Sequence, residues 1–202
     1  MINLLLVRHG ETEWNQQRRY QGQTDIPLNE IGREQALTIA PRMKAYDIDV
    51  VYSSDLKRAF ETAAIISESV GMDIQPDQRL RELSFGVFEG LTFAQIEEQW
   101  PKELAAWMID RSNTPPEGES MEQFAARLDD FLVHIRANHQ DETVLIVSHG
   151  GSLKQIIRTL LGLNGSTGWT FKLSNCSLTE ISLYDPPLLA RLNDRGHFIR
   201  ES

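Results

Sequence analysis

Cysteine is almost absent from this chain of 202 residues, because Cys176 is the only one. A single cysteine cannot form a disulfide within the chain, and no cysteine spacing typical of a zinc site is present, so we expect a reducing compartment. Long apolar runs are also absent. The run that starts at Ile2 ends at Arg8, lacks the basic segment of a signal peptide and is far shorter than the roughly 20 residues of a membrane helix. These absences predict a cytoplasmic protein that has no membrane partner.

Basic residues are scarce relative to acidic ones. The chain has 20 Lys and Arg residues against 29 Asp and Glu residues, which gives a formal net charge of −9 at pH 7. This charge would repel nucleic acids and anionic membranes, so neither is an expected partner. Hydrophobic residues make up 41% of the chain and charged residues 24%, a balance typical of a globular protein that buries one core. We therefore expect a single domain over residues 1–202, and a homodimer is one open possibility for its assembly.

Two stretches of the sequence share one design, in which a short apolar run is followed at once by a polar residue, His and Gly. The first is Leu4-Leu5-Leu6-Val7 before Arg8-His9-Gly10, and the second is Val144-Leu145-Ile146-Val147 before Ser148-His149-Gly150-Gly151. Apolar runs without alternation are typical of strands buried on both faces, as in a parallel sheet covered by helices. Ligands of open α/β sheets gather at the carboxyl ends of the strands. Each histidine therefore marks a candidate site.

Helical and strand-like patterns alternate along the rest of the chain. This alternation predicts an α/β domain with a mainly parallel central sheet flanked by helices. Besides the two histidine strands, we expect strands at 49–52, 178–184 and 189–192. We expect helices over 30–45 with Asn29 as cap, over 56–70 with Ser54 or Asp55 as cap and Gly71 at the end, in pieces within 92–110, and over 120–138 and 152–161.

The five histidines lie in different surroundings. His134 and His139 belong to a polar helical stretch, where we expect them to be exposed, and His197 near the C-terminus is ambiguous. His9 and His149 each follow a buried strand and precede a glycine, which lets the backbone come close to a ligand. Two histidines in matched positions favour a functional role over a structural one.

Arginines near these histidines indicate the chemistry. Arg8 adjoins His9, and Arg58 follows the strand at 49–52, so both lie near carboxyl ends of strands. The planar guanidinium group matches phosphate and carboxylate oxygens and is always charged. Two histidines and two arginines in one pocket would bind an anion, and a permanent cation beside His9 opposes a metal ion. We therefore expect a phosphate site with no metal and no cofactor.

A phosphoryl group in such a pocket is open to in-line attack by a neutral imidazole, which would form a phosphohistidine. The departing alkoxide then needs a proton, and a carboxyl group beside a dianionic phosphate is suited to supply it. Glu82 lies among apolar residues, but Glu11 and Glu89 are equally plausible from residue pattern. At this level the choice of donor stays open.

Ordered motifs along essentially the whole chain resemble the histidine phosphatase superfamily, in its phosphoglycerate-mutase-like branch. They are Arg8-His9-Gly10-Glu11-Thr12 with Trp14-Asn15, Tyr20-Gln21-Gly22-Gln23-Thr24-Asp25-Ile26-Pro27-Leu28, Ser53-Ser54-Asp55-Leu56-Lys57-Arg58-Ala59, Leu80-Arg81-Glu82, Pro116-Glu117-Gly118-Glu119-Ser120 and Val147-Ser148-His149-Gly150-Gly151. The α-ribazole phosphatases and broad-specificity phosphatases are the members most similar to this chain.

The resemblance implies a role for each matching residue. His9 would be the phosphorylated nucleophile, and Glu82 would be the proton donor and later the base that activates water. The other implied members of the site are Arg8, Arg58 and His149 in the phosphate pocket, Asn15, Gln21 and Gly22 along its wall, and Gly150 through its backbone N–H. The family needs no metal.

Phosphatases and mutases of this branch differ after the proton donor. Mutases carry a longer insertion with an arginine pair. In this chain 67 positions separate Glu82 from His149, and the basic residues of the segment between them are isolated from one another. We therefore favour hydrolysis of small phosphorylated metabolites, with α-ribazole 5′-phosphate or a broad range as substrates. Three alternatives stay open: a phosphoserine phosphatase, a phosphoglycerate mutase and a non-catalytic phosphoprotein-binding module.

Acidic residues concentrate in one segment. Residues 92–142 hold 11 Asp and Glu against 4 Lys and Arg, and the resemblance makes this segment a helical cap beside the cleft. We expect such a cap to disfavour multiply charged substrates. The run Pro115-Pro116-Glu117-Gly118-Glu119-Ser120 within it is expected to be surface turn chemistry rather than a substrate contact.

Overall fold

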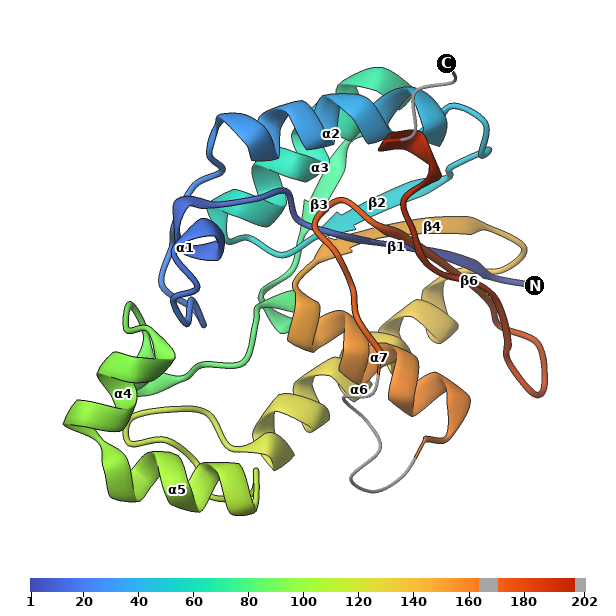
Figure 1. Cartoon of the computed structure of the whole chain (residues 1–202). Helices are drawn as coiled ribbons and strands as arrows, with labels where there is room; N and C mark the ends of the chain where they lie inside the picture. The colour runs from blue at the N-terminus through green and yellow to red at the C-terminus, as the bar shows by residue number, and fades with distance from the viewer. Residues whose placement is uncertain (164–170, 199–202) are drawn as a thin grey trace.

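The computed structural model describes residues 1–163 and 171–198, and it places six strands in one sheet with helices on both faces (Figure 1). The strands are β1 (Asn3–Arg8), β2 (Val50–Ser53), β3 (Ile74–Pro76), β4 (Thr143–Ser148), β5 (Leu178–Ser182) and β6 (Leu188–Asp194), in the spatial order β3-β2-β4-β1-β5-β6. The helices are α1 (Glu13–Gln16), α2 (Glu30–Met43), α3 (Lys57–Val70), α4 (Phe93–Gln99), α5 (Pro101–Ile109), α6 (Met121–Asn138) and α7 (Gly150–Leu161), with short 3₁₀ turns η1 (Gln78–Leu80), η2 (Gly86–Phe88) and η4 (Gly196–Phe198).

Strand pairing confirms the expected α/β fold. β1, β2, β3 and β4 pair in parallel, whereas β5 and β6 add an antiparallel edge. In the β1–β4 pair Arg8 lies opposite Ser148, so the residues that follow these strands emerge side by side. None of the helices in the described part of the chain is long and apolar enough to cross a membrane.

Both faces of the sheet are buried, which explains the apolar runs at residues 4–7 and 144–147. Leu5 and Val7 face a cluster that includes α2 and α3, whereas Leu4 and Leu6 face a cluster that includes α6 and α7. Side chains alternate between the faces of a strand, and each face is covered here, so every position of the run is apolar.

The predicted N-cap residue is confirmed for α2 but not for α3. Asn29 accepts a hydrogen bond from Gly32 N, as expected of a cap, and Gly71 ends α3 at φ +74°. The prediction that Ser54 or Asp55 caps α3 was wrong, because Leu56 is the N-cap residue. The carboxylate of Asp25 accepts from the first free N–H of this helix instead, at 2.7 Å from Lys57 N.

The expected cap segment, residues 92–142, divides into two parts. α4 and α5 pack with η2 around Phe88, Ile96 and Trp107, away from the sheet, as Figure 1 shows in green. α6 instead contributes Phe124 and Phe131 to the core beneath the sheet. The separate cap is therefore shorter than the sequence predicted, because the apolar stripe of α6 is covered by the sheet.

Two histidines outside the sheet also differ from expectation. The Tyr52 hydroxyl lies within hydrogen-bond distance of His134 Nε2, at 3.3 Å, and of His139 Nε2, at 3.0 Å. The side chain of His139 is 10% exposed, so the expectation that it lies in solvent was wrong. His197 lies against α2, where its Nδ1 is 3.3 Å from Arg42 Nη1.

Candidate active site

The two histidines predicted from the strand pattern lie next to each other. His9 follows β1, its backbone N–H donates to Ser148 O at 2.9 Å, and its ring centroid is 5.2 Å from that of His149. Both side chains are buried, with His9 3% exposed and His149 fully enclosed. The parallel register of β1 and β4 thus converts two distant sequence motifs into one site.

The His9 side chain is a neutral imidazole with one unprotonated ring nitrogen. Its Nδ1 lies 2.6 Å from Gly10 O, and because a carbonyl oxygen only accepts, Nδ1 holds the ring proton and Nε2 keeps a lone pair. The pKa of His9 lies well below its ordinary value of 6.5, first because of burial and then because Arg58 and Arg8 repel a further positive charge. His9 is therefore neutral at pH 7.

Arg8 contributes a half-buried cation whose Nε is buried. Its Nη1 donates to Leu173 O at 2.7 Å, whereas its buried Nε has no hydrogen-bond partner in the described part of the chain. Burial lowers the pKa of Arg8, with opposition from Glu82. An unpaired buried donor is costly, and an anionic oxygen would satisfy it.

Arg58 is held by carbonyl groups of the loop that precedes α2. Its guanidinium donates to Gly22 O at 2.6 Å and Thr24 O at 2.9 Å, and its Nε donates to His149 Nδ1 at 3.2 Å. Burial lowers the pKa of Arg58 to about 10, so the group stays charged at pH 7. Several short hydrogen bonds fix this cation in the site without neutralising it.

His149 accepts from Arg58 at Nδ1, so its Nε2 carries the proton, which points to Ser54 Oγ at 2.8 Å. Burial is the first cause that lowers its pKa well below 6.5, and the charge of Arg58 is the second. His149 is thus a neutral group behind Arg58.

Of three candidate carboxylates, Glu82 is the one that lines the cavity beside His9. Its Oε1 accepts from Leu83 N at 3.0 Å and its Oε2 from Gly151 N at 2.9 Å. Glu89 instead organises the loop around Gly22, since its carboxylate accepts from Gln23 N at 3.0 Å and Thr24 N at 2.8 Å. Glu11 accepts from the Asn29 side chain at 3.1 Å.

The cavity that His9 and Glu82 line has a volume of about 290 Å³. Seven of the nine predicted site residues line it: Arg8, His9, Asn15, Gln21, Gly22, Arg58 and Glu82. His149 and Gly150 do not, because His149 is enclosed behind Arg58 and Gly150 lies in the first turn of α7 near Arg8. Thr12 orients two of the lining amides, since its hydroxyl donates to Gln21 Oε1 at 2.9 Å and its N–H to Asn15 Oδ1 at 3.2 Å.

Part of the cavity wall was not predicted from the sequence. The lining residues that the sequence did not assign to the site are Trp14, Arg18, Arg19, Tyr20 and Phe85. The pair Thr12 and Asn15 forms a capping box that starts α1, a local signal that could have placed this segment beside the site. No comparable signal marks Phe85, whose place depends on packing against Tyr20 at 5.2 Å between ring centroids.

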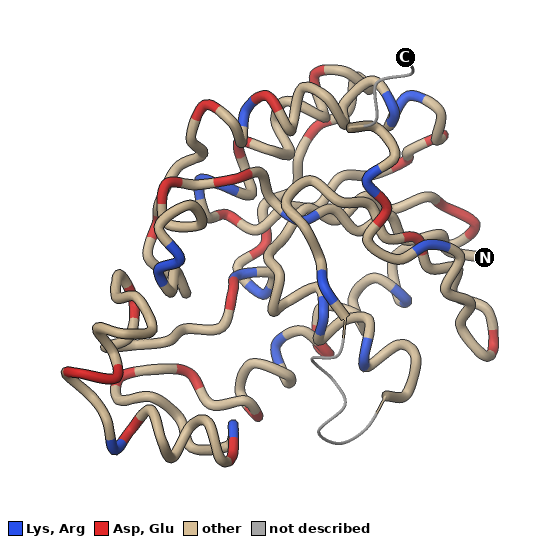
Figure 2. Tube along the Cα trace, in the orientation of Figure 1, with Lys and Arg blue, Asp and Glu red and all other residues tan. Residues whose placement is uncertain are grey.

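Acidic residues of 92–142 lie apart from this cavity, contrary to the expected effect of an acidic cap. None of them lines it or a neighbouring cavity of about 200 Å³ that lies beyond Phe85 in the described part of the chain. The basic residue Arg111 of this segment does line the second cavity, with its guanidinium 3.5 Å from the Trp107 ring centroid. Figure 2 shows the acidic positions in red along the outer turns of α4 and α5.

No group of three or more His, Cys, Asp or Glu side chains within residues 1–163 and 171–198 is arranged to hold a metal ion. The charges that surround His9 come instead from Arg58, which is buried, and Arg8, which is half-buried. A mostly parallel sheet that presents two neutral histidines and two arginines at its carboxyl edge defines an enzyme of phosphoryl chemistry. In agreement, residues 4–194 match the histidine phosphatase superfamily (branch 1), and the chain belongs to this superfamily.

Individual relatives carry different names. The chain is 40% identical over 193 residues to the probable phosphoglycerate mutase GpmB of Shigella boydii serotype 18, which covers 94% of this chain and 89% of that protein. The structure of a mycobacterial glucosyl-3-phosphoglycerate phosphatase with VO3 is similar at a TM-score of 0.85 and 33% identity, covering 96% of this chain and 99% of that one. A putative α-ribazole-5′-P phosphatase from Escherichia coli K-12 gives a TM-score of 0.90 at 28% identity, covering 96% and 97%.

Proposed function

We propose that this protein is a metal-independent phosphatase that hydrolyses small phosphomonoester metabolites through a phosphohistidine at His9. One observation carries the proposal: His9 keeps an unprotonated Nε2 in a cavity that Arg8, Arg58 and Glu82 also line. A neutral nucleophile, two fixed cations and a carboxyl group are the parts that transfer of a phosphoryl group requires. The proposal includes the cytoplasmic location, which the single cysteine supports.

In the first step, Arg8 and Arg58 bind non-bridging oxygens of the phosphate and spread its charge. His9 Nε2 forms a bond to phosphorus as the bond from phosphorus to the ester oxygen breaks. The carboxyl group of Glu82 gives a proton to that oxygen, so a neutral alcohol departs. His149 supports Arg58 from behind through the hydrogen bond at Nδ1.

In the second step, the carboxylate of Glu82 takes a proton from water and the water oxygen bonds to phosphorus. The bond between phosphorus and His9 Nε2 breaks, inorganic phosphate is released, and both side chains return to their starting states. Since the same arginines hold the phosphoryl group throughout, neither step calls for a metal ion.

The cavity supports small esters with a broad choice of alcohol. Its outer wall combines aromatic rings of Trp14, Tyr20 and Phe85 with the guanidinium groups of Arg18 and Arg19. Rings accept the faces of sugars and bases, whereas the arginines attract anionic groups. α-Ribazole 5′-phosphate fits this description as one substrate.

A phosphoglycerate mutase is the second candidate, which the 40% identity to the probable phosphoglycerate mutase GpmB favours. A mutase must return the phosphoryl group to a bound intermediate before water reaches it. Incubation with 3-phosphoglycerate and 2,3-bisphosphoglycerate separates the two, because a mutase yields the 2-phospho isomer and a phosphatase yields free phosphate.

A phosphoserine phosphatase and a binding module receive less support. Residues 193–197 correspond to a C-terminal arm that helps bind the amino acid in similar phosphoserine phosphatases, and here they are held against α2 by the ion pair of Arg42 with Asp194. A non-catalytic module would be expected to lack His9 or Glu82, and the chain has both.

The direct test measures phosphate release from p-nitrophenyl phosphate in EDTA and then from a panel that includes α-ribazole 5′-phosphate, phosphoserine and 3-phosphoglycerate. We expect activity in EDTA, its loss in His9→Ala, and a labelled phosphoenzyme that the same variant abolishes. His134→Ala is a matched control, since His134 lies outside the cavity. Full activity of His9→Ala would refute the proposal.

A further inference from the structure

Glu82 lies in a stretch of chain without regular structure. Residues 81–85 separate the 3₁₀ turns η1 and η2, and no helix or strand hydrogen bonds hold the backbone of residues 82–84. A carboxyl group that moves protons must stay within hydrogen-bond reach of the reacting oxygen. Its position must therefore come from contacts with other parts of the chain.

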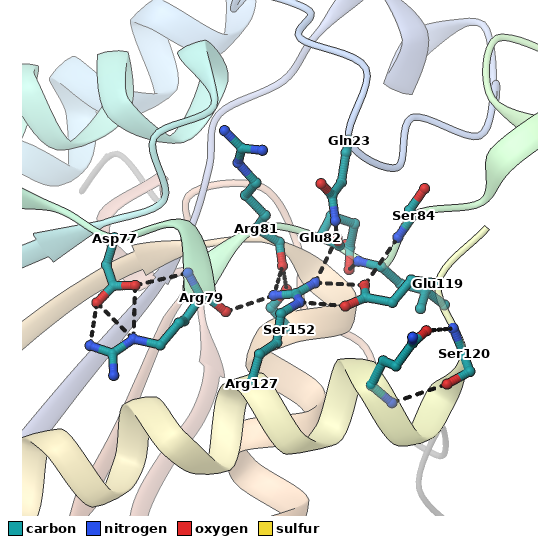
Figure 3. Close-up of polar contacts among 12 residues, drawn as sticks. Gln23, Asp77, Arg79, Arg81, Glu82, Ser84, Glu119, Ser120, Arg127 and Ser152 are labelled. Carbon is teal, nitrogen blue, oxygen red and sulfur yellow. Dashed lines mark hydrogen bonds and ion pairs between the residues drawn. The ribbon is translucent and has the colours of Figure 1, made fainter. Parts of the chain in front are cut away.

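Arg127 of α6 makes several of these contacts, beside others from Gln23, Glu89 and Gly151. The guanidinium has five N–H groups, and each makes one hydrogen bond (Figure 3). Nη1 donates to Arg79 O and Arg81 O at 2.6 Å each, Nη2 donates to Glu82 O at 2.9 Å, and Nε and Nη2 donate to the two carboxylate oxygens of Glu119 at 2.6 and 2.9 Å. One side chain thus holds three carbonyl groups around the proposed proton donor.

Glu119 holds both Arg127 and Ser84, which lies two residues after Glu82. Its carboxylate forms a two-pronged ion pair with Arg127, and its backbone N–H donates to Ser84 O at 3.0 Å. The side chains of Glu119 and Arg127 are 14% and 18% exposed. Glu119 therefore supports the Glu82 stretch, a contact that the expectation of surface turn chemistry did not include.

Side chains next to His149 hold the same stretch from the other side. Ser148 Oγ donates to Leu80 O at 2.7 Å and Ser152 Oγ donates to Arg81 O at 2.7 Å. These serines flank the histidine motif, so they tie the Glu82 stretch to the phosphate-binding edge of the sheet.

We propose that Arg127 is the positioning residue of Glu82, with Glu119 as its anchor. Arg127 does not line the cavity beside His9, so it acts through the backbone that carries the carboxyl group. The inference rests on the proposed function, in which Glu82 protonates the departing oxygen. A lysine cannot take this place, because one ammonium nitrogen cannot reach three carbonyl groups and a carboxylate together.

Two substrates with different leaving groups distinguish positioning from a merely structural role. p-Nitrophenolate is a stable anion that departs without a proton, whereas an alkoxide, as from glycerol phosphate, must be protonated. The ratio kcat/KM reports only steps up to departure of the alcohol, so it excludes the later attack of water. If Glu82 loses its position, kcat/KM should therefore fall far more for glycerol phosphate than for p-nitrophenyl phosphate.

For Arg127→Gln we expect kcat/KM to fall about 100-fold with glycerol phosphate and less than about 5-fold with p-nitrophenyl phosphate. Arg127→Lys and Glu119→Gln should also lower kcat/KM more for glycerol phosphate than for p-nitrophenyl phosphate, but by smaller factors. They replace Arg127→Gln if that variant does not fold. Glu82→Gln removes the proton donor itself, so it shows how differently kcat/KM falls with the two substrates when no donor is present. Arg136→Gln, an exposed position on the same helix, is the matched control and should match the unaltered protein.

Equal losses with both substrates, or no loss in a folded variant, would overturn the inference and leave the proposed function intact. If the unaltered protein releases phosphate from neither substrate, the proposed function fails and this inference fails with it. Thermal unfolding of every variant reports stability separately from these rates.

Discussion

Glu82 Oε2 accepts a hydrogen bond from the backbone N–H of Gly151, 2.9 Å away, which joins the proposed proton donor to the first turn of the helix that follows His149. A Cβ atom on residue 151 would lie 2.2 Å from Glu82 Oε1, far inside contact distance. The glycine therefore leaves room for the carboxyl group, and the hydrogen bond fixes its orientation.

Gly151→Ala should displace Glu82 without weakening α7, because alanine favours helices more than glycine does. We expect kcat/KM for an alkyl phosphate to fall at least about 10-fold while the melting temperature stays constant or rises. Gly162→Ala provides the converse control. Residue 162 has open space around it but φ +63°, so this variant should lose stability and keep its activity. Unchanged kinetics in Gly151→Ala would contradict the assigned place of Glu82.

Acidification should destabilise the protein below pH 6.5. Burial keeps His9 and His149 neutral in the folded state by holding each pKa well below 6.5, whereas the unfolded chain binds protons near that value. Because the unfolded state then holds more protons, stability falls as pH falls, by up to about 1.4 kcal/mol per pH unit for each histidine. Chemical denaturation at pH 7.5, 6.5 and 5.5 measures this slope. His9→Gln should reduce the slope, and an identical slope would show that His9 is not held neutral.

Arg58→Lys should disable the site. A lysine cannot donate to Gly22 O, Thr24 O and His149 together, and it leaves buried acceptors unpaired. We expect a loss of about 100-fold or more in kcat/KM and a lower melting temperature. Arg33→Lys is the control, because Arg33 forms an exposed ion pair with Glu61 that contributes about 0–1 kcal/mol. Wild-type kinetics in Arg58→Lys would refute the role of the guanidinium.

Acidic residues of α4 and α6 should not control the choice between monophosphates and bisphosphates. Glu97, Glu98 and Glu122 are exposed and outside the cavity, so water and salt screen their charges. We expect their joint replacement by Gln to leave the ratio of kcat/KM values for bisphosphate and monophosphate substrates within about 2-fold. Arg18→Gln, which changes a lining residue, should lower kcat/KM for the bisphosphate more than for the monophosphate. A ratio that rises strongly in the acidic-residue variant would restore the acidic-cap hypothesis.

The sequence by itself determined the α/β class and the neighbourhood of His9 and His149. Both follow from short-range information, since buried parallel strands need continuous apolar runs and parallel strands bring their carboxyl ends to one edge. Asn29 as a helix cap and Gly71 as a helix end were readable for the same reason, because each acts within a few residues of its own position.

The resemblance to the histidine phosphatase superfamily selected Glu82 as the proton donor, but only the tertiary structure decided what holds it beside the cavity. Residue pattern alone left Glu11, Glu82 and Glu89 equivalent, whereas folding engages Glu89 with the backbone near Gly22 and places Glu82 in the lining of the cavity that His9 also lines. In the same way, the start of α3 is capped by Asp25, 32 residues away, and Arg127 reaches carbonyl groups more than 40 residues away. Such partners meet only when helices pack on the sheet, so no local pattern in the chain records them.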